Sequence, residues 1–298
     1  GIDCSFISRN FKQADYVERQ SGLCELALHN FPLLGLGHIR IHNRDGVSYL
    51  QEMLPVDCLF LDPARRDGHG GKTVAISDCE PDVTVLEPLL VDKAKKVMVK
   101  LSPMLDLSLA LNELKTVRAV HIVAVNNECK ELLLILQKES VSSEVSIHCE
   151  HIAGNGESRH YTFTLKREKT SPCLLADEVG TYLYEPNAAI LKAGAFRSLT
   201  QTYPVAKLHL NSHLYTSVSL VPDFPGRRFR VEAVSGFGKK ELKAFLMDMD
   251  KANITIRNFP LSVAELRKRL KLKEGGDDYI FATTLSGGQK VLIRGKKC

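Results

Sequence analysis

The chain has 298 residues, of which 44% are apolar and 25% charged, and its net charge is +5. This composition fits a globular protein of about two domains at ~150 residues each. No apolar run approaches the ~20 residues that span a bilayer, and the beginning GIDCSFISRN has neither a basic leader nor an apolar core. We therefore expect a cytoplasmic protein with no membrane partner.

In the first half of the chain, strand and helix patterns alternate. The predicted strands cover 14–20, 38–45, 57–62, 96–103 and 119–127, and the predicted helices cover 21–35, 46–54, 82–94 and 105–114. Nearly continuous apolar strands separated by helices indicate a parallel sheet covered on both faces. We predict a doubly wound, Rossmann-like α/β domain over 1–168, in which strands at 131–137, 145–151 and 159–168 pair antiparallel at one edge.

The polar stretch KREKTSP marks the end of this domain, and a segment with helical spacing follows at 184–203. Beyond it the pattern favours a small two-layer α+β domain. Its predicted elements are a strand at 229–238, a helix at 239–252, a strand at 253–260, a helix at 262–272 and strands at 277–285 and 289–297. The expected ranges are 169–222 for the linking segment and 223–298 for the last domain.

The eight cysteines form no C-x-x-C pair, and several lie in apolar runs such as DCLFL. Small buried thiols are common in such runs, so we expect reduced structural cysteines. No group of His or Cys residues has the spacing of a zinc site. The sequence therefore predicts no bound metal.

Three successive predicted strands end near a carboxylate, namely Glu18, Asp45 and Asp62. Ligands of open parallel sheets bind outside the carboxyl ends of the strands, so these acids could share one cleft. A carboxylate in the position of Glu18 typically accepts hydrogen bonds from ribose hydroxyls. The alternative is that each acid caps the helix that follows it, and for Asp45 this alternative has equal weight.

The turn after the third of these strands has an unusual composition. Pro63 removes a backbone donor and fixes φ, so the chain must leave the sheet while Asp62 faces the crevice. Arg65 and Arg66 add fork-shaped cations that could hold a phosphate, stack on a base or pair with the acids. Each arginine could equally be a structural ion-pair partner.

The order of GID, YVERQ, NRDG, LFLDPARRD and KLSP resembles class I S-adenosylmethionine-dependent methyltransferases, specifically a bacterial group with a C-terminal THUMP-like domain. NNECKE, YEPNAAILKAG, FPGRRF and RNFPLSVAELRKRLKLKEGGDDYIFAT are also similar to that group. The resemblance covers nearly the whole chain. It implies S-adenosylmethionine as cofactor, a small ferredoxin-like segment over 169–222 and a THUMP-like RNA-binding domain over 223–298.

The resemblance also implies roles for individual residues. Gly1 and Asp3 correspond to the end of the glycine-rich loop around the methionine moiety, Glu18 to the ribose ligand and Asp45 to a residue near the adenine amino group. Asp62 corresponds to an acid that lies beside the cofactor and holds the target nitrogen. The family has a central first strand before the residue that is Gly1 here, so we expect the sheet to lack that strand.

The signature (D/N)PP(Y/F) of amino-methylating relatives begins here at Asp62 and Pro63. Ala64 and Arg65 replace the second proline and the aromatic residue, so this loop offers no ring to stack on a base. Enzymes that make 5-methyluridine have an Asp-Pro-Pro-Arg turn and a nucleophilic cysteine after the next strand. KLSP has Ser102 there, which without a base is a poor nucleophile, and we interpret the later Cys129 as structural.

Basic charge is concentrated at the C-terminal end, where Phe224 to Cys298 contain 17 Lys and Arg against 8 Asp and Glu. Such a block attracts polyanions, and the resemblance implies that it binds RNA, either tRNA or rRNA. The candidate phosphate contacts are Arg66, Arg227, Arg228, Arg257, Arg267, Lys268, Arg269, Lys271 and Lys273. For the run LRKRLKLK, a solvated amphipathic helix is the alternative interpretation.

Together these features predict an S-adenosylmethionine-dependent methyltransferase that acts on a nucleobase of RNA, with Asp62, Pro63 and Arg65 at the catalytic centre. The alternative hypothesis is an RNA-binding module whose methyltransferase-like domain is inactive.

Overall fold

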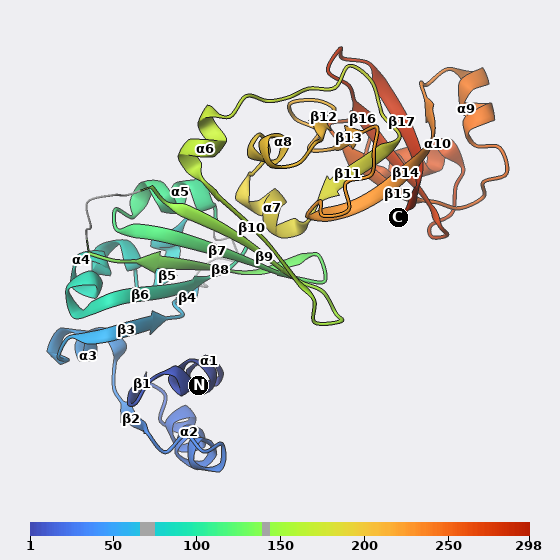
Figure 1. Cartoon of the computed structure of the whole chain (residues 1–298). Coiled ribbons are helices and arrows are strands. Elements are labelled where there is room, and N and C mark those ends of the chain that lie inside the picture. Colours follow the sequence, from blue (N-terminus) through green and yellow to red (C-terminus); the bar gives the residue numbers. More distant parts are fainter. Residues whose placement is uncertain (66–74, 139–143) are drawn as a thin grey trace. The chain divides into compact units, whose positions relative to one another are not determined.

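The computed structural model describes residues 1–65, 75–138 and 144–298. The chain divides into two compact units (Figure 1). The first comprises Gly1–Lys100, Met104–Val117 and Ile135–Ser140, and the second comprises Leu101–Pro103, Arg118–Leu134 and Val141–Cys298.

The first unit begins with a small α/β layer. Its elements are α1 (Ile2–Ile7), η1 (Ser8–Asn10), β1 (Ala14–Glu18), α2 (Ser21–Leu33) and β2 (Ile39–Asn43). β1 and β2 are parallel, with Glu18 opposite Asn43. Phe31 is buried in a small apolar cluster and meets the Tyr16 ring edge-on at a centroid distance of 5.5 Å. Gly35, at a φ of 72°, provides the left-handed turn that follows α2.

The next elements are α3 (Gly46–Glu52), β3 (Val56–Leu61), β4 (Ala64–Arg65), η2 (Ile76–Asp78), β5 (Cys79–Glu80), α4 (Val83–Lys93), β6 (Ala94–Leu101) and α5 (Leu107–Glu113). β3 is parallel to β6, and the register brings Leu61 opposite Val99. Helices α3, α4 and α5 each begin after an aspartate, namely Asp45, Asp82 and Asp106, whose carboxylate accepts a backbone N–H of the first turn.

Four longer strands follow, namely β7 (Val117–Val125), β8 (Glu128–Leu136), β9 (Ser146–Ile152) and β10 (Ser158–Thr164). The six-stranded sheet has the order β10-β9-β7-β8-β6-β3. β7 and β9 are parallel, whereas β9 and β10 are antiparallel, which confirms antiparallel pairing at one edge for these last two strands. The strand predicted over 131–137 was wrongly placed at that edge. It corresponds to β8, which lies between β7 and β6, because the two-residue turn of Asn126 and Asn127 returns the chain directly beside β7. β1 and β2 form a separate sheet, and no strand of the described residues joins β1 to β3.

A second sheet of seven strands has the order β12-β13-β11-β14-β17-β16-β15. The elements here are α6 (Leu165–Thr170), β11 (Tyr182–Pro186), α7 (Ala188–Ala193), α8 (Ser198–Thr202), β12 (Ala206–Lys207), β13 (Tyr215–Ser217), β14 (Gly226–Ser235), α9 (Lys239–Phe245), β15 (Asn253–Arg257), α10 (Val263–Leu270), β16 (Asp278–Thr284) and β17 (Lys290–Lys297). Buried side chains form two apolar clusters against it, one around Phe229 and Phe281 and the other around Phe245 and Leu266.

β11 and β14 are hydrogen-bonded neighbours in this sheet. The segment 169–222 and the segment 223–298 therefore contribute strands to one continuous layer. At the point where they meet, a Cβ on Gly226 would overlap the carbonyl oxygen of Glu185. Only glycine lets the two backbones approach so closely at this position.

Three predicted elements were wrong in extent. The strand expected to reach residue 168 ends at Thr164, because the Thr164 hydroxyl accepts the Arg167 N–H and starts α6. The helical spacing at 184–203 contains the end of β11 and two short helices, since Asn187 caps α7 and Gly194 ends it at a φ of 73°. The helix expected over 239–252 ends at Phe245.

His213 makes the stability of the second unit depend on pH. Burial, together with the nearby cations Lys207 and Arg257, lowers the pKa of His213 to about 4. The unfolded chain protonates this residue near pH ~6.5. Between these two pH values the unfolded state binds more protons, so the stability gained from a neutral His213 is lost as the pH falls from ~6.5 toward 4.

We predict that His213→Asn flattens this pH dependence. Asparagine tolerates the φ of 53° at this position and does not titrate. The parental chain should lose about 1 kcal/mol more unfolding free energy than the variant between pH ~7.5 and ~5, after allowance for partial solvent screening. Urea unfolding at both pH values measures the difference, and equal losses in the two proteins would contradict the assignment.

Candidate functional site

Three charged side chains meet where β3 and β6 end. Asp3 lies in the first turn of α1, Asp62 follows the last residue of β3, and Lys100 is the penultimate residue of β6. The Lys100 Nζ donates to Asp3 Oδ2 at 2.6 Å and lies 2.8 Å from Asp62 Oδ2. The Lys100 side chain is 22% exposed, whereas those of Asp3 and Asp62 are 44% and 52% exposed. The two acids therefore remain open to a ligand.

The charge of Lys100 is secured by these contacts. Burial by itself disfavours the ammonium form, but the hydrogen bonds with Asp3 and Asp62 outweigh it and raise the pKa of Lys100 above its ordinary value. Sequence reasoning missed Lys100. The available signal was that KLSP ends the strand next to LFLDP, so that Asp62 and Lys100 emerge side by side from neighbouring parallel strands.

Of the sequence-predicted cofactor residues, the structure thus brings Asp3 and Asp62 together through one lysine. Glu18 ends β1, and its Oε1 accepts the Gln20 N–H at 2.8 Å. Gly1 precedes α1, where a Cβ would lie 2.9 Å from Cζ of Phe31, so this start of the helix is closely packed.

Asp45 is the N-cap of α3. Its Oδ1 accepts the backbone N–H of Ser48 at 2.9 Å and the Ser48 hydroxyl at 3.0 Å. The bond from the Ser48 N–H, followed by that from its hydroxyl, lowers the pKa of Asp45. The structure therefore shows the helix-capping alternative for this residue.

Pro63 separates β3 from β4, and the backbone of Arg65 pairs with Cys79 of β5 in a short antiparallel bridge. The chain leaves the main sheet at Pro63, as expected from the missing backbone donor. Arg66 lies outside the described residues.

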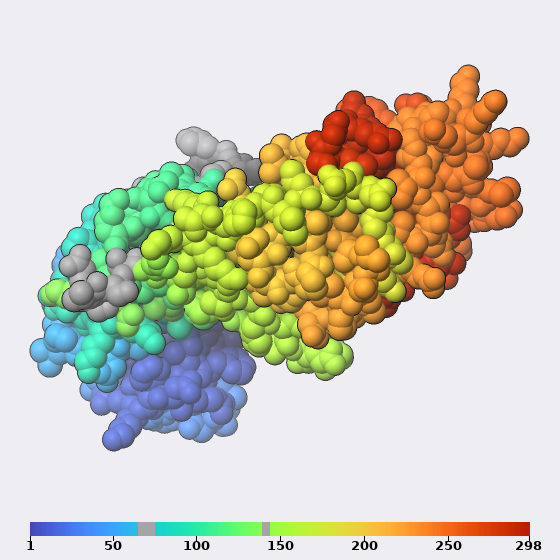
Figure 2. Space-filling view, turned by 45° about the horizontal axis from the view of Figure 1, so that its top comes forward, coloured from blue at the N-terminus to red at the C-terminus, as the bar shows by residue number. Residues whose placement is uncertain are grey.

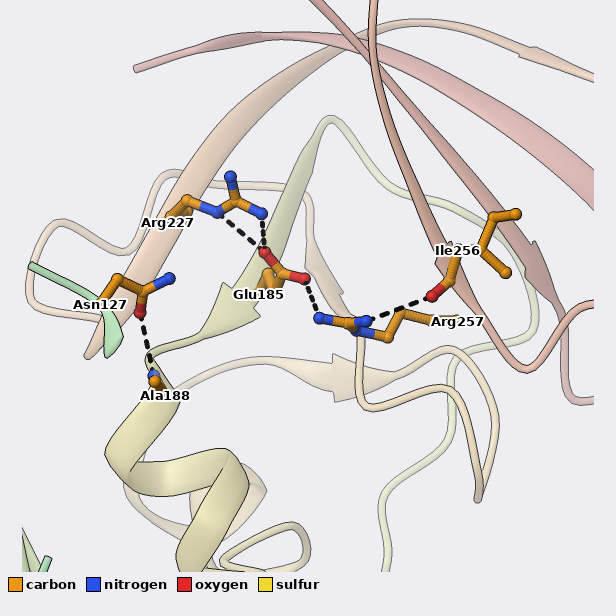
Figure 3. Close-up of polar contacts among 6 residues, drawn as sticks. All are labelled: Asn127, Glu185, Ala188, Arg227, Ile256 and Arg257. Atoms are coloured by element: carbon orange, nitrogen blue, oxygen red, sulfur yellow. Dashed lines mark hydrogen bonds and ion pairs between the residues drawn. The ribbon is translucent and has the colours of Figure 1, made fainter. Parts of the chain in front are cut away.

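Two of the predicted phosphate contacts are bound to a buried acid (Figure 3). Glu185 of β11, whose side chain is 3% exposed, accepts the Arg227 Nε–H on Oε2 at 2.8 Å and an Arg257 guanidinium N–H on Oε1 at 2.8 Å. Arg257 also donates to the Ile256 carbonyl at 3.2 Å. Arg227 and Arg257 therefore act as ion-pair partners of a buried acid, a role that the sequence analysis did not predict for them.

The remaining predicted phosphate contacts differ in their surroundings, and Lys271 and Lys273, which follow α10, are exposed. Arg228 donates to the Pro222 carbonyl, and Arg267 donates to the Ala252 carbonyl at 3.1 Å. Arg269 is exposed and lies over the Phe237 ring, 5.0 Å from its centroid, and Lys268 is exposed. Because Leu266 and Leu270 of α10 are buried, Lys268 and Arg269 lie on the solvent side of this helix.

Helix α9 contributes basic residues that sequence reasoning missed. Lys239, Lys240 and Lys243 lie on α9, and the apolar cluster around Phe245 and Leu266 packs α9 and α10 against the same sheet. We call Lys239, Lys240, Lys243, Lys268 and Arg269 the basic helix pair. Figure 2 shows this part of the chain in orange, on the surface of the second unit. The signal in the sequence was KKELK directly after a predicted strand.

Comparisons with known proteins describe two regions of the C-terminal half. A model of a ferredoxin-like domain matches residues 182–225, and a model described as THUMP domain-like matches residues 226–297. The chain is 33% identical to a solved structure described as a "putative methyltransferase" from Porphyromonas gingivalis W83. That similarity has a TM-score of 0.86 and covers 100% of this chain and 80% of the other. A search of curated proteins found no match.

The fold and these similarities define a class I methyltransferase with an additional α+β region. The chain belongs to the bacterial methyltransferase family that carries a C-terminal THUMP-like domain. Within residues 1–65, 75–138 and 144–298, no helix is long and apolar enough to cross a membrane.

We predict that Glu185→Gln destabilises the chain by about 2 kcal/mol, because it leaves two guanidinium groups around a buried neutral amide. Loss of one partner of a buried ion pair costs about 3–5 kcal/mol, and the partial exposure of both arginines reduces this value. The matched control is Glu232→Gln, which removes a more exposed partner of Arg294. Urea unfolding of both variants is the measurement, and equal effects would contradict a special role for Glu185.

Proposed function

We propose that the protein is a cytoplasmic S-adenosylmethionine-dependent methyltransferase that modifies a nucleobase of tRNA or rRNA. The observation that carries the proposal is the pair of open carboxylates, Asp3 and Asp62, arranged around the cation of Lys100. In this proposal residues 1–168 carry out the transfer, 169–222 form the ferredoxin-like link and 223–298 bind RNA.

The residues present fit the proposed cofactor. Two carboxylates that already hold one ammonium group suit a ligand that carries both an ammonium and a sulfonium. Lys100 engages Oδ2 of both acids, so we assign Oδ1 of Asp3 to the ammonium of the cofactor. Glu18 would bind the ribose hydroxyls, and Gly1 and Asp45 would flank the methionine and adenine ends. When bound, the cofactor supplies an electrophilic methyl group.

Asp62 and Lys100 would act on the acceptor base. Asp62 Oδ1 is assigned to the N–H of the target nitrogen, where a carboxylate orients the lone pair toward the methyl carbon and can accept the proton. Lys100 holds the Asp62 carboxylate in position through their contact at 2.8 Å. Pro63 holds this carboxylate at the end of the strand, and Arg65 is assigned to the neighbouring nucleotide phosphate. Positioning and electrostatics then lower the barrier without a covalent intermediate.

RNA binding is assigned to the basic helix pair. Its five cations lie on two helices packed on one sheet, and Lys268 and Arg269 are both exposed. Contacts of this kind bind phosphates and position the substrate without reading its sequence.

Calorimetric titration with S-adenosylmethionine and with S-adenosylhomocysteine tests the cofactor site. Asp3→Asn should weaken binding of both, because both carry the ammonium group. Lys100→Met removes the internal cation and with it a charge that would repel a bound sulfonium. The preference for the sulfonium form over the neutral thioether should therefore rise about fivefold, which corresponds to about 1 kcal/mol of charge repulsion.

The matched control for Lys100→Met is Lys12→Met, which changes an exposed lysine of the same unit. No binding of either ligand by the parental chain would refute the proposed cofactor. An unchanged preference in Lys100→Met would refute the role of the carboxylate pair.

The RNA assignment is tested by methyl transfer from labelled S-adenosylmethionine to total RNA. Asp62→Asn should abolish transfer and leave RNA binding intact. The double variant Lys268→Glu with Arg269→Glu should weaken RNA binding and lower its salt-dependence slope by about 1.4, at ~0.7 per phosphate contact on single strands. RNA binding without transfer by the parental chain would favour the inactive RNA-binding module instead.

A further inference from the structure

One face of the strands β7, β9 and β10 carries an unusual set of polar side chains. In the register of these strands, His121 of β7 lies opposite His148 of β9, and Glu150 of β9 lies opposite His160 of β10. Because side chains alternate along a strand, His148 and Glu150 share one face, and their cross-strand neighbours share it with them. Figure 1 shows these strands running side by side.

Three of these side chains bring metal-binding atoms close together. One ligand atom each of His121, His148 and Glu150 lies within 4.8 Å of the others. His121 Nδ1 is 3.8 Å from Glu150 Oε1. In a tetrahedral site with Zn–N and Zn–O bonds of ~2.1 Å, neighbouring ligand atoms are about 3.4 Å apart. Side-chain rotations that shorten these separations would therefore close the set around one ion.

The two ligands on β9 are each oriented by a second residue on β10. His148 Nδ1 is 3.1 Å from the Thr162 hydroxyl, which leaves Nε2 as the ring nitrogen for an ion. His160 Nδ1 hydrogen-bonds Glu150 Oε2, which leaves Oε1 facing His121. Outer hydrogen bonds of this kind fix the tautomer and the orientation of ligands in metal sites.

The imidazole rings also have freedom to reorient. The rings of His121 and His148 are stacked, with centroids 4.5 Å apart and planes 12° from parallel. A shared ion requires the rings to turn until their lone pairs converge, and the χ2 torsion of histidine is broad enough to allow this. The side chains of His121 and Glu150 are 36% and 23% exposed, so an ion can enter from solvent.

We propose that His121, His148 and Glu150 form a binding site for a divalent transition-metal ion of the zinc type. Two imidazoles and one carboxylate are ligands that such ions prefer, and three protein ligands leave one coordination position open. The site lies within the second unit and does not depend on the proposed methyl transfer. His160 and Thr162 are its positioning residues.

The test is calorimetric titration of the chelator-treated full chain with Zn²⁺, and with Co²⁺ monitored by visible absorption. All measurements use a Cys298→Ser background, because this cysteine is exposed and could bind Zn²⁺ by itself. One ion per chain should bind, and His148→Ala should abolish this binding. His160→Ala should weaken it about 10–100-fold by releasing Glu150. His29→Ala, which changes an exposed histidine on α2, is the matched control.

Circular dichroism of each variant shows whether the fold is retained, and Glu150→Gln provides a second, nearly isosteric variant that should also lose the ion. Saturable binding of equal affinity in His148→Ala and Glu150→Gln would overturn the proposal. Absence of saturable binding in the background protein would overturn it as well. A tetrahedral Co²⁺ spectrum that disappears in both variants and persists in His29→Ala would support it.

Discussion

The geometry of the first unit depends on one ammonium group. Burial by itself lowers the pKa of Lys100, and its two carboxylate partners outweigh this effect and raise the pKa above its ordinary value. The same contacts hold the start of α1 against the ends of β3 and β6, which are otherwise separate in the chain. A cation shared by two acids is a compact way to hold two carboxylates close together in an open site, because its positive charge offsets their mutual repulsion.

The second unit uses the opposite arrangement, in which one buried carboxylate holds two cations. Glu185 of β11 pairs with Arg227 of β14, the next strand in the sheet, and with Arg257 at the end of β15. The difference matters for function. The carboxylates of Asp3 and Asp62 are open to solvent, whereas the carboxylate of Glu185 is buried. The number of charged residues in a segment does not show which charges are buried in ion pairs and which are exposed. Seventeen basic residues in the last segment include structural arginines as well as the exposed cations of α9 and α10.

Sequence patterns predicted most strands and helices because the chain alternates apolar runs with clear caps. The errors arose where one residue changes the local structure, as at Thr164 and Gly194. For the site, the strand ends identified Asp62, and the resemblance identified Asp3. Lys100 was missed because its role depends on the register between β3 and β6. His121 and His148 were missed because β7 and β9, which bring them together, are distant in the sequence. Pairing of this kind is a tertiary property that local periodicity does not contain.

The close approach of Gly226 to Glu185 has a consequence for how the protein can be divided. The boundary between the two matched regions, 182–225 and 226–297, lies at the first residue of β14, and β14 is hydrogen-bonded to β11 of the preceding region. A fragment that starts at residue 226 would lose β11, expose one edge of β14 and leave two guanidinium groups without their acid. The ferredoxin-like and THUMP-like regions of this chain are thus two sequence modules that share one sheet, so a cut between them divides that sheet.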